Sequence, residues 1–314
     1  MNIRENEHGL SEVVGFVLLL GIIVAAFSLW MTYVVPVEGR EKEIEHMDGV
    51  NDRFTDYKIT LDSLWINNRS GNTVSTSINL GTGGGTTQAG GLFIPLLKPL
   101  SSSATLSLRN LGDTITINSS STEGVAAVSA QFPLTMNMVE YQSNNNYWIQ
   151  QRYYYQLGGV FLSQDDGITN RVSPPFSLSN GTTFAAVSIT PVQITGGGVI
   201  GGSGPVRIDT RMKALPQFAI SSFPANAWVN ISVNVTDIST ATMWLNLFNG
   251  TAEREQIDKG WYNSSVRENP VTKRATAFIN ITGPSSNPAT NDVSLSVTRA
   301  EYYVVFNNIA SGFS

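Results

Sequence analysis

The feature that most constrains this chain is a stretch of 23 residues without a charge, Val13 to Val35, which precedes Pro36 close to the N-terminus. As an α-helix rising 1.5 Å per residue, the run would be about 34 Å long, which matches a bilayer hydrocarbon core of roughly 30 Å. Trp30 and Tyr33 stand near its end, where amphipathic aromatic side chains favour the membrane interface. The run therefore predicts a membrane-spanning helix.

A cleaved secretory signal is the alternative reading of the same run, because Val24-Ala25-Ala26 offers small residues of the kind found at cleavage sites. Two features argue against it. Arg4 is balanced by Glu5 and Glu7, so the flank carries little positive charge, and the apolar run continues nine residues beyond Ala26. We expect the helix to be retained.

The helix is predicted to continue beyond the membrane after a kink at Pro36, whose ring removes one backbone donor. Residues 37–65 form an amphipathic arm, because their apolar positions recur at steps of three and four. Those positions are Ile44, Met47, Val50, Phe54, Tyr57, Leu61 and Leu64. We expect this stripe to dock on the domain that follows.

Residues 66–314 are expected to form a large β-rich body, so the predicted fold class is α+β, with a long kinked helix followed by an antiparallel, sandwich-like domain. Short runs rich in Val, Ile, Thr and Phe alternate with turn residues. "WVNISVNVT" shows the period of two that is typical of a half-buried strand, and so do "TAFINIT" and "DVSLSVT". One short helix interrupts the strands, with Ser239 as its cap and Asn249-Gly250 as its end.

Two glycine-rich stretches, 81–91 and 195–204, lack the Gly-Lys-Ser/Thr ending of a phosphate-binding loop. They read as flexible hairpin tips. If the body has an internal seam between two domains, we place it near 195–204.

Composition excludes several kinds of function. A net charge of −5 without a basic cluster argues against nucleic acid as a partner. The chain has no Cys and only two His, His8 and His46, which both flank the apolar run. A Ser-His-Asp triad or a zinc-histidine site inside the body is therefore excluded. We predict no enzyme activity, no metal and no cofactor; a paired-carboxylate hydrolase stays formally open, with Glu123, Glu140, Asp165, Asp166 and Asp209 as its candidates.

An aromatic-rich stretch and a set of N-glycosylation sequons are two further features of the body. "NYWIQQRYYYQLGG" places Tyr153 and Tyr155 on one face of a strand and Tyr154 on the other, so we expect core packing for some of these aromatics; the alternative is that exposed ones stack on sugars or contact other subunits. Eight Asn-x-Ser/Thr sequons permit N-glycosylation of a secreted protein, at Asn68, Asn118, Asn180, Asn230, Asn234, Asn249, Asn263 and Asn280.

The opening stretch "GLSEVVGFVLLLGIIVAA" resembles the N-terminus of archaeal type IV pilin-like proteins. "YYYQLGGVFLSQDD", "SPPFSL" and "GPVRIDTR" look like an uncharacterised group of archaeal pilin-like membrane proteins. The resemblance implies a leader of residues 1–9 and cleavage between Gly9 and Leu10 by a prepilin-type peptidase. Residues 10–36 would then anchor the subunit and afterwards pack in a filament core.

By analogy with bacterial pilins, Glu12 would contact the N-terminal amine of a neighbouring subunit. Gly15 and Gly21 would let neighbouring helices approach closely. The predicted function is a structural subunit of a pilus-like filament, with copies of itself, other pilin-like subunits and the membrane as partners. The body would be extracellular and the N-terminus cytoplasmic before assembly. A membrane-anchored adhesion or envelope protein that does not assemble is the alternative, and a surface glycan-processing enzyme is the third reading.

Overall fold

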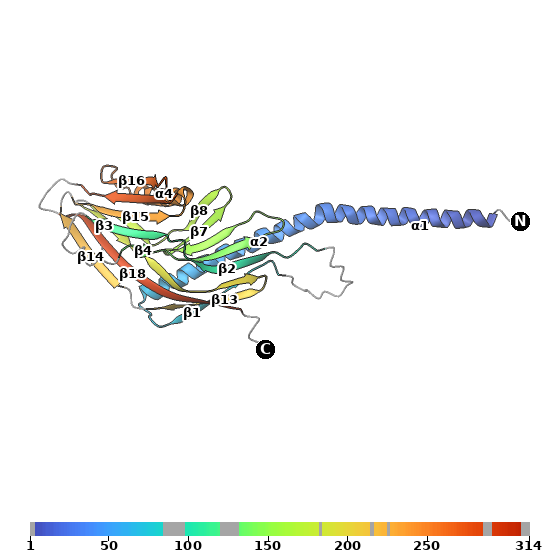
Figure 1. Ribbon diagram of the computed structural model, residues 1–314, viewed down its shortest axis with the longest axis horizontal. Coiled ribbons are helices and arrows are strands. Elements are labelled where there is room, and N and C mark those ends of the chain that lie inside the picture. The colour runs from blue at the N-terminus through green and yellow to red at the C-terminus, as the bar shows by residue number, and fades with distance from the viewer. Residues whose placement is uncertain are drawn as a thin grey trace.

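The computed structural model describes residues 4–83, 98–119, 132–181, 184–213, 217–224, 227–284 and 291–308. Three helical segments run end to end: α1 (Arg4–Leu29), the π-helical turn η1 (Trp30–Val34) and α2 (Val35–Ile66). Figure 1 shows α1 projecting away from the body while α2 lies within it. The predicted α+β class, a long helix followed by a β-rich body, is confirmed.

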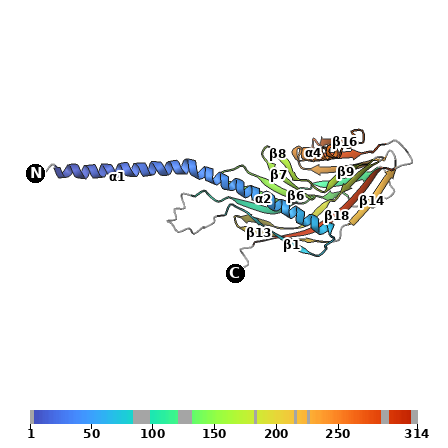
Figure 2. The ribbon, with the colours of Figure 1, turned by 180° about the vertical axis from the view of Figure 1, so that it is seen from behind.

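The long helix changes direction at η1, immediately before Pro36 (Figure 2). The amide of Val35 bonds the carbonyl of Trp30, five residues earlier, instead of the usual four. Thr32 also returns its hydroxyl to the carbonyl of Ser28 at 2.7 Å, a contact that bends helices. The missing N–H of Pro36 is therefore accommodated by a wider turn, and the helix does not break.

The described part of the β body contains three sheets. The six-stranded sheet has the order β12-β2-β5-β6-β7-β8. Its strands are β12 (Val199–Gly202), β2 (Ser103–Arg109), β5 (Met138–Asn144), β6 (Arg152–Gln156), β7 (Gly159–Gln164) and β8 (Gly167–Val172). The five-stranded sheet has the order β16-β17-β15-β3-β4. Its strands are β16 (Tyr262–Glu268), β17 (Ala275–Ile281), β15 (Val229–Val235), β3 (Thr114–Ser119) and β4 (Leu134–Thr135).

The seven-stranded sheet is built around β18 (Asn291–Asn308), which pairs with four other strands. Those strands are β10 (Ala185–Ile189), β11 (Val192–Gly197), β13 (Pro205–Met212) and β14 (Gln217–Pro224), and the sheet is completed by β1 (Thr73–Asn79) and β9 (Phe176–Asn180). The sequence predicted antiparallel pairing for the body. β18 is one strand of 18 residues, and β10 and β11 instead pair with it in parallel.

Two hydrophobic cores flank the six-stranded sheet. One forms around α2, where Tyr57 packs edge-on against Tyr155 at 5.4 Å and shares a 2.8 Å hydrogen bond with Thr210 of β13. The other forms around α4 (Ile238–Arg254), where Trp244 contacts Phe161 at 5.6 Å. The expected division of the tyrosines is confirmed, because Tyr153 and Tyr155 enter the first core and Tyr154 the second.

The prediction for the ends of α4 was wrong. Asp237 caps the helix, since its carboxylate accepts the amide of Thr240 at 2.8 Å, and Ser239 lies inside the first turn. The helix also continues through Asn249-Gly250 to Arg254, because Thr251 and Ala252 remain buried in the core. Tertiary packing here outweighs the helix-ending preference of glycine.

The glycine-rich stretch at 195–204 is not a hairpin tip, because its residues extend β11, form β12 and lead into β13. Gly196 adopts a φ of +117° and pairs with Val304 of β18. A Cβ atom at Gly196 would lie 2.1 Å from the carbonyl oxygen of Val304. Glycine is therefore required where this strand passes close to β18. Of the other stretch, residues 84–91 lie outside the described residues.

We predict that Gly196→Ala lowers the free energy of unfolding by about 3 kcal/mol or more, because it combines a disfavoured φ with a backbone clash. Gly197→Ala is the matched control, since a Cβ there meets no atom within 4 Å. Chemical unfolding of both variants in detergent measures the difference. Equal stability of the two variants would show that the pairing of β11 with β18 adjusts to a side chain at Gly196 without loss of stability.

Candidate functional site

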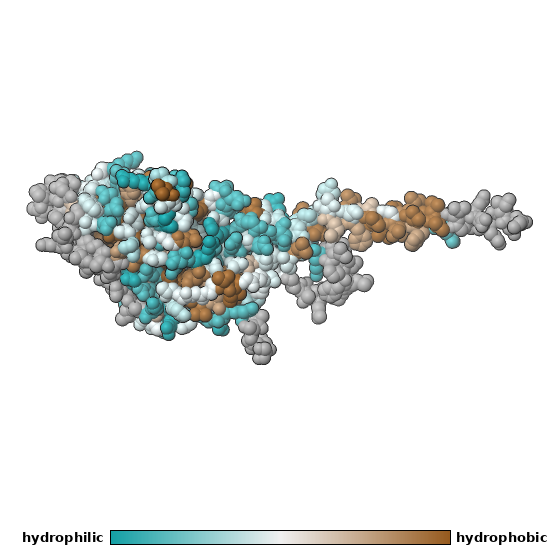
Figure 3. Space-filling model, in the orientation of Figure 1, coloured by the Kyte–Doolittle hydropathy of each residue, from teal (hydrophilic) through white to brown (hydrophobic). Residues whose placement is uncertain are grey.

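The apolar half of the long helix is exposed on all sides. Every described side chain from Glu12 to Val34 is exposed, and Figure 3 shows this apolar rod extending from a largely polar body. The helix is long and apolar enough to cross a membrane. Leaving so many large apolar side chains in water would cost about 1.5–3 kcal/mol each, so this surface requires lipid or protein around it.

The residues predicted for processing and assembly lie along this rod. Gly15 and Gly21 have no neighbour within 4 Å, so the helix surface is open at both glycines. Glu12 stands exposed at the N-terminal border of the apolar run. The backbone of Gly9 and Leu10 is helical, and their side chains lie outside the described residues. Ile23, Ala26, Phe27 and Trp30 line a shallow apolar depression on the side of the same helix.

A group of contacts that we call the helix clasp joins the start of α2 to the loop between β5 and β6. Its residues are Gly39, Arg40 and Glu43 on α2, and Asn146, Tyr147 and Trp148 in the loop. Glu43 is buried, and its two carboxylate oxygens accept the backbone amides of Asn146 and Tyr147 at 2.7 and 2.8 Å. A charged acceptor makes each of these hydrogen bonds stronger than a neutral one.

The same clasp depends on a glycine and on an aromatic ring. A Cβ at Gly39 would lie 2.4 Å from the Tyr147 ring, so only glycine lets the tyrosine lie against the helix. The guanidinium of Arg40 covers the Trp148 ring at 4.4 Å from its centre, a cation–π contact. Sequence reasoning missed this clasp, because Gly39, Arg40 and Glu43 do not belong to an apolar stripe.

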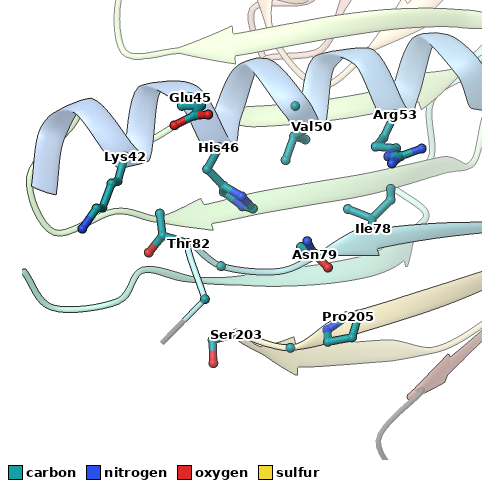
Figure 4. Close-up of a pocket in the computed structure, with 14 residues that line it drawn as sticks. Lys42, Glu45, His46, Val50, Arg53, Ile78, Asn79, Thr82, Ser203 and Pro205 are labelled. Atoms are coloured by element: carbon teal, nitrogen blue, oxygen red, sulfur yellow. The ribbon is translucent and has the colours of Figure 1, made fainter. Parts of the chain in front are cut away.

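A groove of about 770 Å³ lies beside the clasp, between α2 and the turns that follow β1 and precede β13. Figure 4 shows Lys42, His46 and Arg53 on one wall, facing Asn79 and Thr82. Nε2 of His46 lies 2.9 Å from the hydroxyl of Tyr141, which itself donates to the Leu80 carbonyl at 3.0 Å. Burial lowers the pKa of His46, although Glu43 opposes this shift, so its neutral form is favoured.

The carboxylates considered for hydrolysis have separate structural surroundings. Glu140 is buried and pairs with Arg109 at 2.8 Å, while Asp165 and Asp166 form the turn between β7 and β8. Asp209 accepts hydrogen bonds from Ser75, Arg207 and Asn307 on the surface of its sheet. Glu123 lies outside the described residues. Among the described residues, no group of three or more His, Cys, Asp or Glu side chains could hold a metal ion.

Comparisons with protein-family models, with curated proteins and with solved structures give no match for this chain.

Four of the eight sequon asparagines form a single row across the five-stranded sheet. Asn118, Asn230, Asn280 and Asn263 are paired in register on four adjacent strands. Neighbouring strands lie about 4.8 Å apart, so the row is too crowded to carry four glycans. Asn118 and Asn263 are exposed, whereas the two central asparagines are half-buried.

The other four sequons differ in the freedom of their side chains. Asn68 is exposed in the turn after α2, and Asn180 donates to the carbonyl of Gln256 at 2.9 Å. Asn249 lies within α4 and accepts a hydrogen bond from Ser264. Asn234 donates to Thr276 at 2.8 Å and accepts from Arg274 at 2.7 Å. The side-chain amide of Asn234 is therefore held on both sides.

We predict that Glu43→Ala destabilises the chain by about 2–4 kcal/mol, because two amides lose their charged acceptor. Hydrogen exchange at residues 146–147 should accelerate in the same variant. Glu45→Ala is the matched control, since Glu45 is exposed two residues away and should change stability by less than about 0.5 kcal/mol. A Glu43 variant as stable and as protected as the Glu45 variant would rule out the clasp.

Glycopeptide mass spectrometry of the protein from its native cells should find any N-glycans at exposed sites such as Asn68 and Asn263. Asn234 should be unmodified, because a glycan on its nitrogen would compete with the hydrogen bond to Thr276. Asn263→Gln should remove the glycan mass at that site without changing stability. Occupancy of Asn234 would contradict the structural argument.

Proposed function

We propose that this protein is a structural subunit of an extracellular pilus-like filament that assembles through its N-terminal helix. The observation that carries the proposal is the apolar rod that ends at Val34, exposed on every side and continuous with a helix built into the body. An apolar helix leaving a bilayer exposes its side chains to water unless other helices cover it. Packing of many such helices in a filament core supplies that cover.

The proposed assembly uses the predicted residues along the rod. A peptidase of the prepilin type would cut between Gly9 and Leu10, which frees an amine close to Glu12. Gly15 and Gly21 leave the helix surface open, so neighbouring backbones can approach closely there. Copies of this chain or other pilin-like subunits are the partners, first in the membrane and then in the filament.

A membrane-anchored surface protein that does not assemble is the second candidate. One observation favours it: the exposed apolar segment matches the thickness of a bilayer, so lipid alone would satisfy it. In that case the extracellular body would carry a binding or adhesion function, and the helix would stay in the membrane.

We expect sheared surface material from the native cells to contain filaments whose subunits begin at Leu10, as seen by electron microscopy and N-terminal sequencing. Assembly buries the rod and processing precedes assembly, so both readouts should agree. Recovery only from membranes, with Met1 retained, would contradict the filament proposal and support the second candidate.

Two glycine variants separate processing from assembly. Gly9→Val should block processing, because the small residue before the proposed cut is replaced. Gly15→Val should leave processing unchanged but reduce filament yield, since a branched side chain now covers an open part of the rod. Normal maturation of Gly9→Val would reject the proposed cleavage site.

A further inference from the structure

The end of the body from which the apolar helix leaves carries an exposed hydrophobic rim. We define the rim as Val37 on α2, Leu100 before β2, and Trp148 and Ile149 in the loop between β5 and β6. Val37, Leu100 and Ile149 are 65%, 70% and 45% exposed. Three large aliphatic side chains exposed so close to a membrane-spanning candidate suggest an interaction surface rather than scattered exposure.

The clasp places the rim at a known level along the helix. Tyr147 lies against Gly39, and Trp148 lies under Arg40, so the loop tip is level with residues 39 and 40. Leu100 is held at the same level, because its amide donates to the hydroxyl of Tyr147 at 3.1 Å. The contacts at residues 39 and 40 are therefore four or five residues beyond Val35, where the 23-residue apolar stretch before Pro36 ends, and Val37 lies two residues beyond it.

This level coincides with the headgroup layer of a bilayer. Four or five residues correspond to about 6–7.5 Å of helix, and the polar layer on each side of the hydrocarbon core is roughly 5–7.5 Å thick. The residue types also suit this layer, since Trp prefers the interface and Arg can extend its charge toward water. Arg40 over the Trp148 ring supplies both groups at one point.

We propose that the rim rests in the phospholipid headgroup layer of the membrane that the helix spans, so that the body is seated on the bilayer as well as tethered to it. The inference rests on membrane insertion of the apolar helix, which both candidate functions share. The buried carboxylate of Glu43 holds the rim to the helix, so the seating has a defined height.

Single-cysteine labelling tests this seating, because the chain contains no native Cys. An environment-sensitive fluorophore is attached to Leu100→Cys or Ile149→Cys in the full chain, reconstituted into phosphatidylcholine vesicles with some phosphatidylglycerol. Ile59→Cys is the matched control, since Ile59 is 60% exposed on α2 but 22 residues beyond Val37, or about 33 Å along the helix. Leu19→Cys reports on the membrane span itself.

We expect labels at positions 100 and 149 to shift their emission to shorter wavelength and to be quenched by lipids that carry a spin label near the headgroup. Quenching by aqueous iodide should be about tenfold weaker there than at position 59, because the ion is excluded from the apolar side of the interface. Position 19 should be quenched only from the lipid.

Iodide access at 100 and 149 equal to that at 59, with position 19 still protected, would overturn the seating and leave the membrane span intact. Iodide access at position 19 would overturn membrane insertion, and with it both the seating and the anchor shared by the two candidate functions. Circular dichroism of each labelled variant, compared with the unlabelled chain, verifies that the body is folded.

Discussion

The packing of one face of α2 into the β body is the interaction on which the rest of the structure depends. Tyr57 contacts the six-stranded sheet through Tyr155 and the seven-stranded sheet through Thr210, so a single helix joins the two sheets. Tyr302 of β18 adds a hydrogen bond to the carbonyl of Leu61 at 2.6 Å. Because α2 continues α1 without a break in the helix, the same packing also sets the direction of the apolar rod.

Much of this arrangement could be predicted from the sequence. The stripe from Met47 to Leu64 is buried as its spacing indicated, because apolar residues at steps of three and four report a helix face directly. Two further turns of the same face were hidden. Gly39 and Glu43 continue the spacing and are buried, yet glycine and a carboxylate do not read as core residues. Their burial depends on the loop from β5 to β6, which lies more than a hundred residues away.

The sheet architecture was less accessible to sequence reasoning. Alternation identifies a strand but carries no information on the direction of its neighbour, so the parallel pairs of β18 could not be foreseen. Arg299 interrupts the apolar pattern of β18. In the structure its guanidinium lies on the sheet surface and donates to Gln193 of β11 at 2.6 Å, so the strand continues past it. The row of sequon asparagines likewise depends on strand register.

The candidate site likewise has one part that the sequence predicts and one part that it does not. Exposure of the apolar rod follows from its length and composition, whereas the clasp requires contacts across the fold. Described residues from Arg4 to Ile66 form one continuous helical path, without a flexible linker between rod and body. A membrane tether that did not seat the body on the bilayer would function equally well with a loose linker. In a helical assembly, however, the angle between rod and body determines where each body lies on the filament surface. The contacts of Glu43, Gly39 and the buried stripe of α2 fix this angle, and they also fix the height of the rim above the membrane span, so one rigid connection serves both candidate functions.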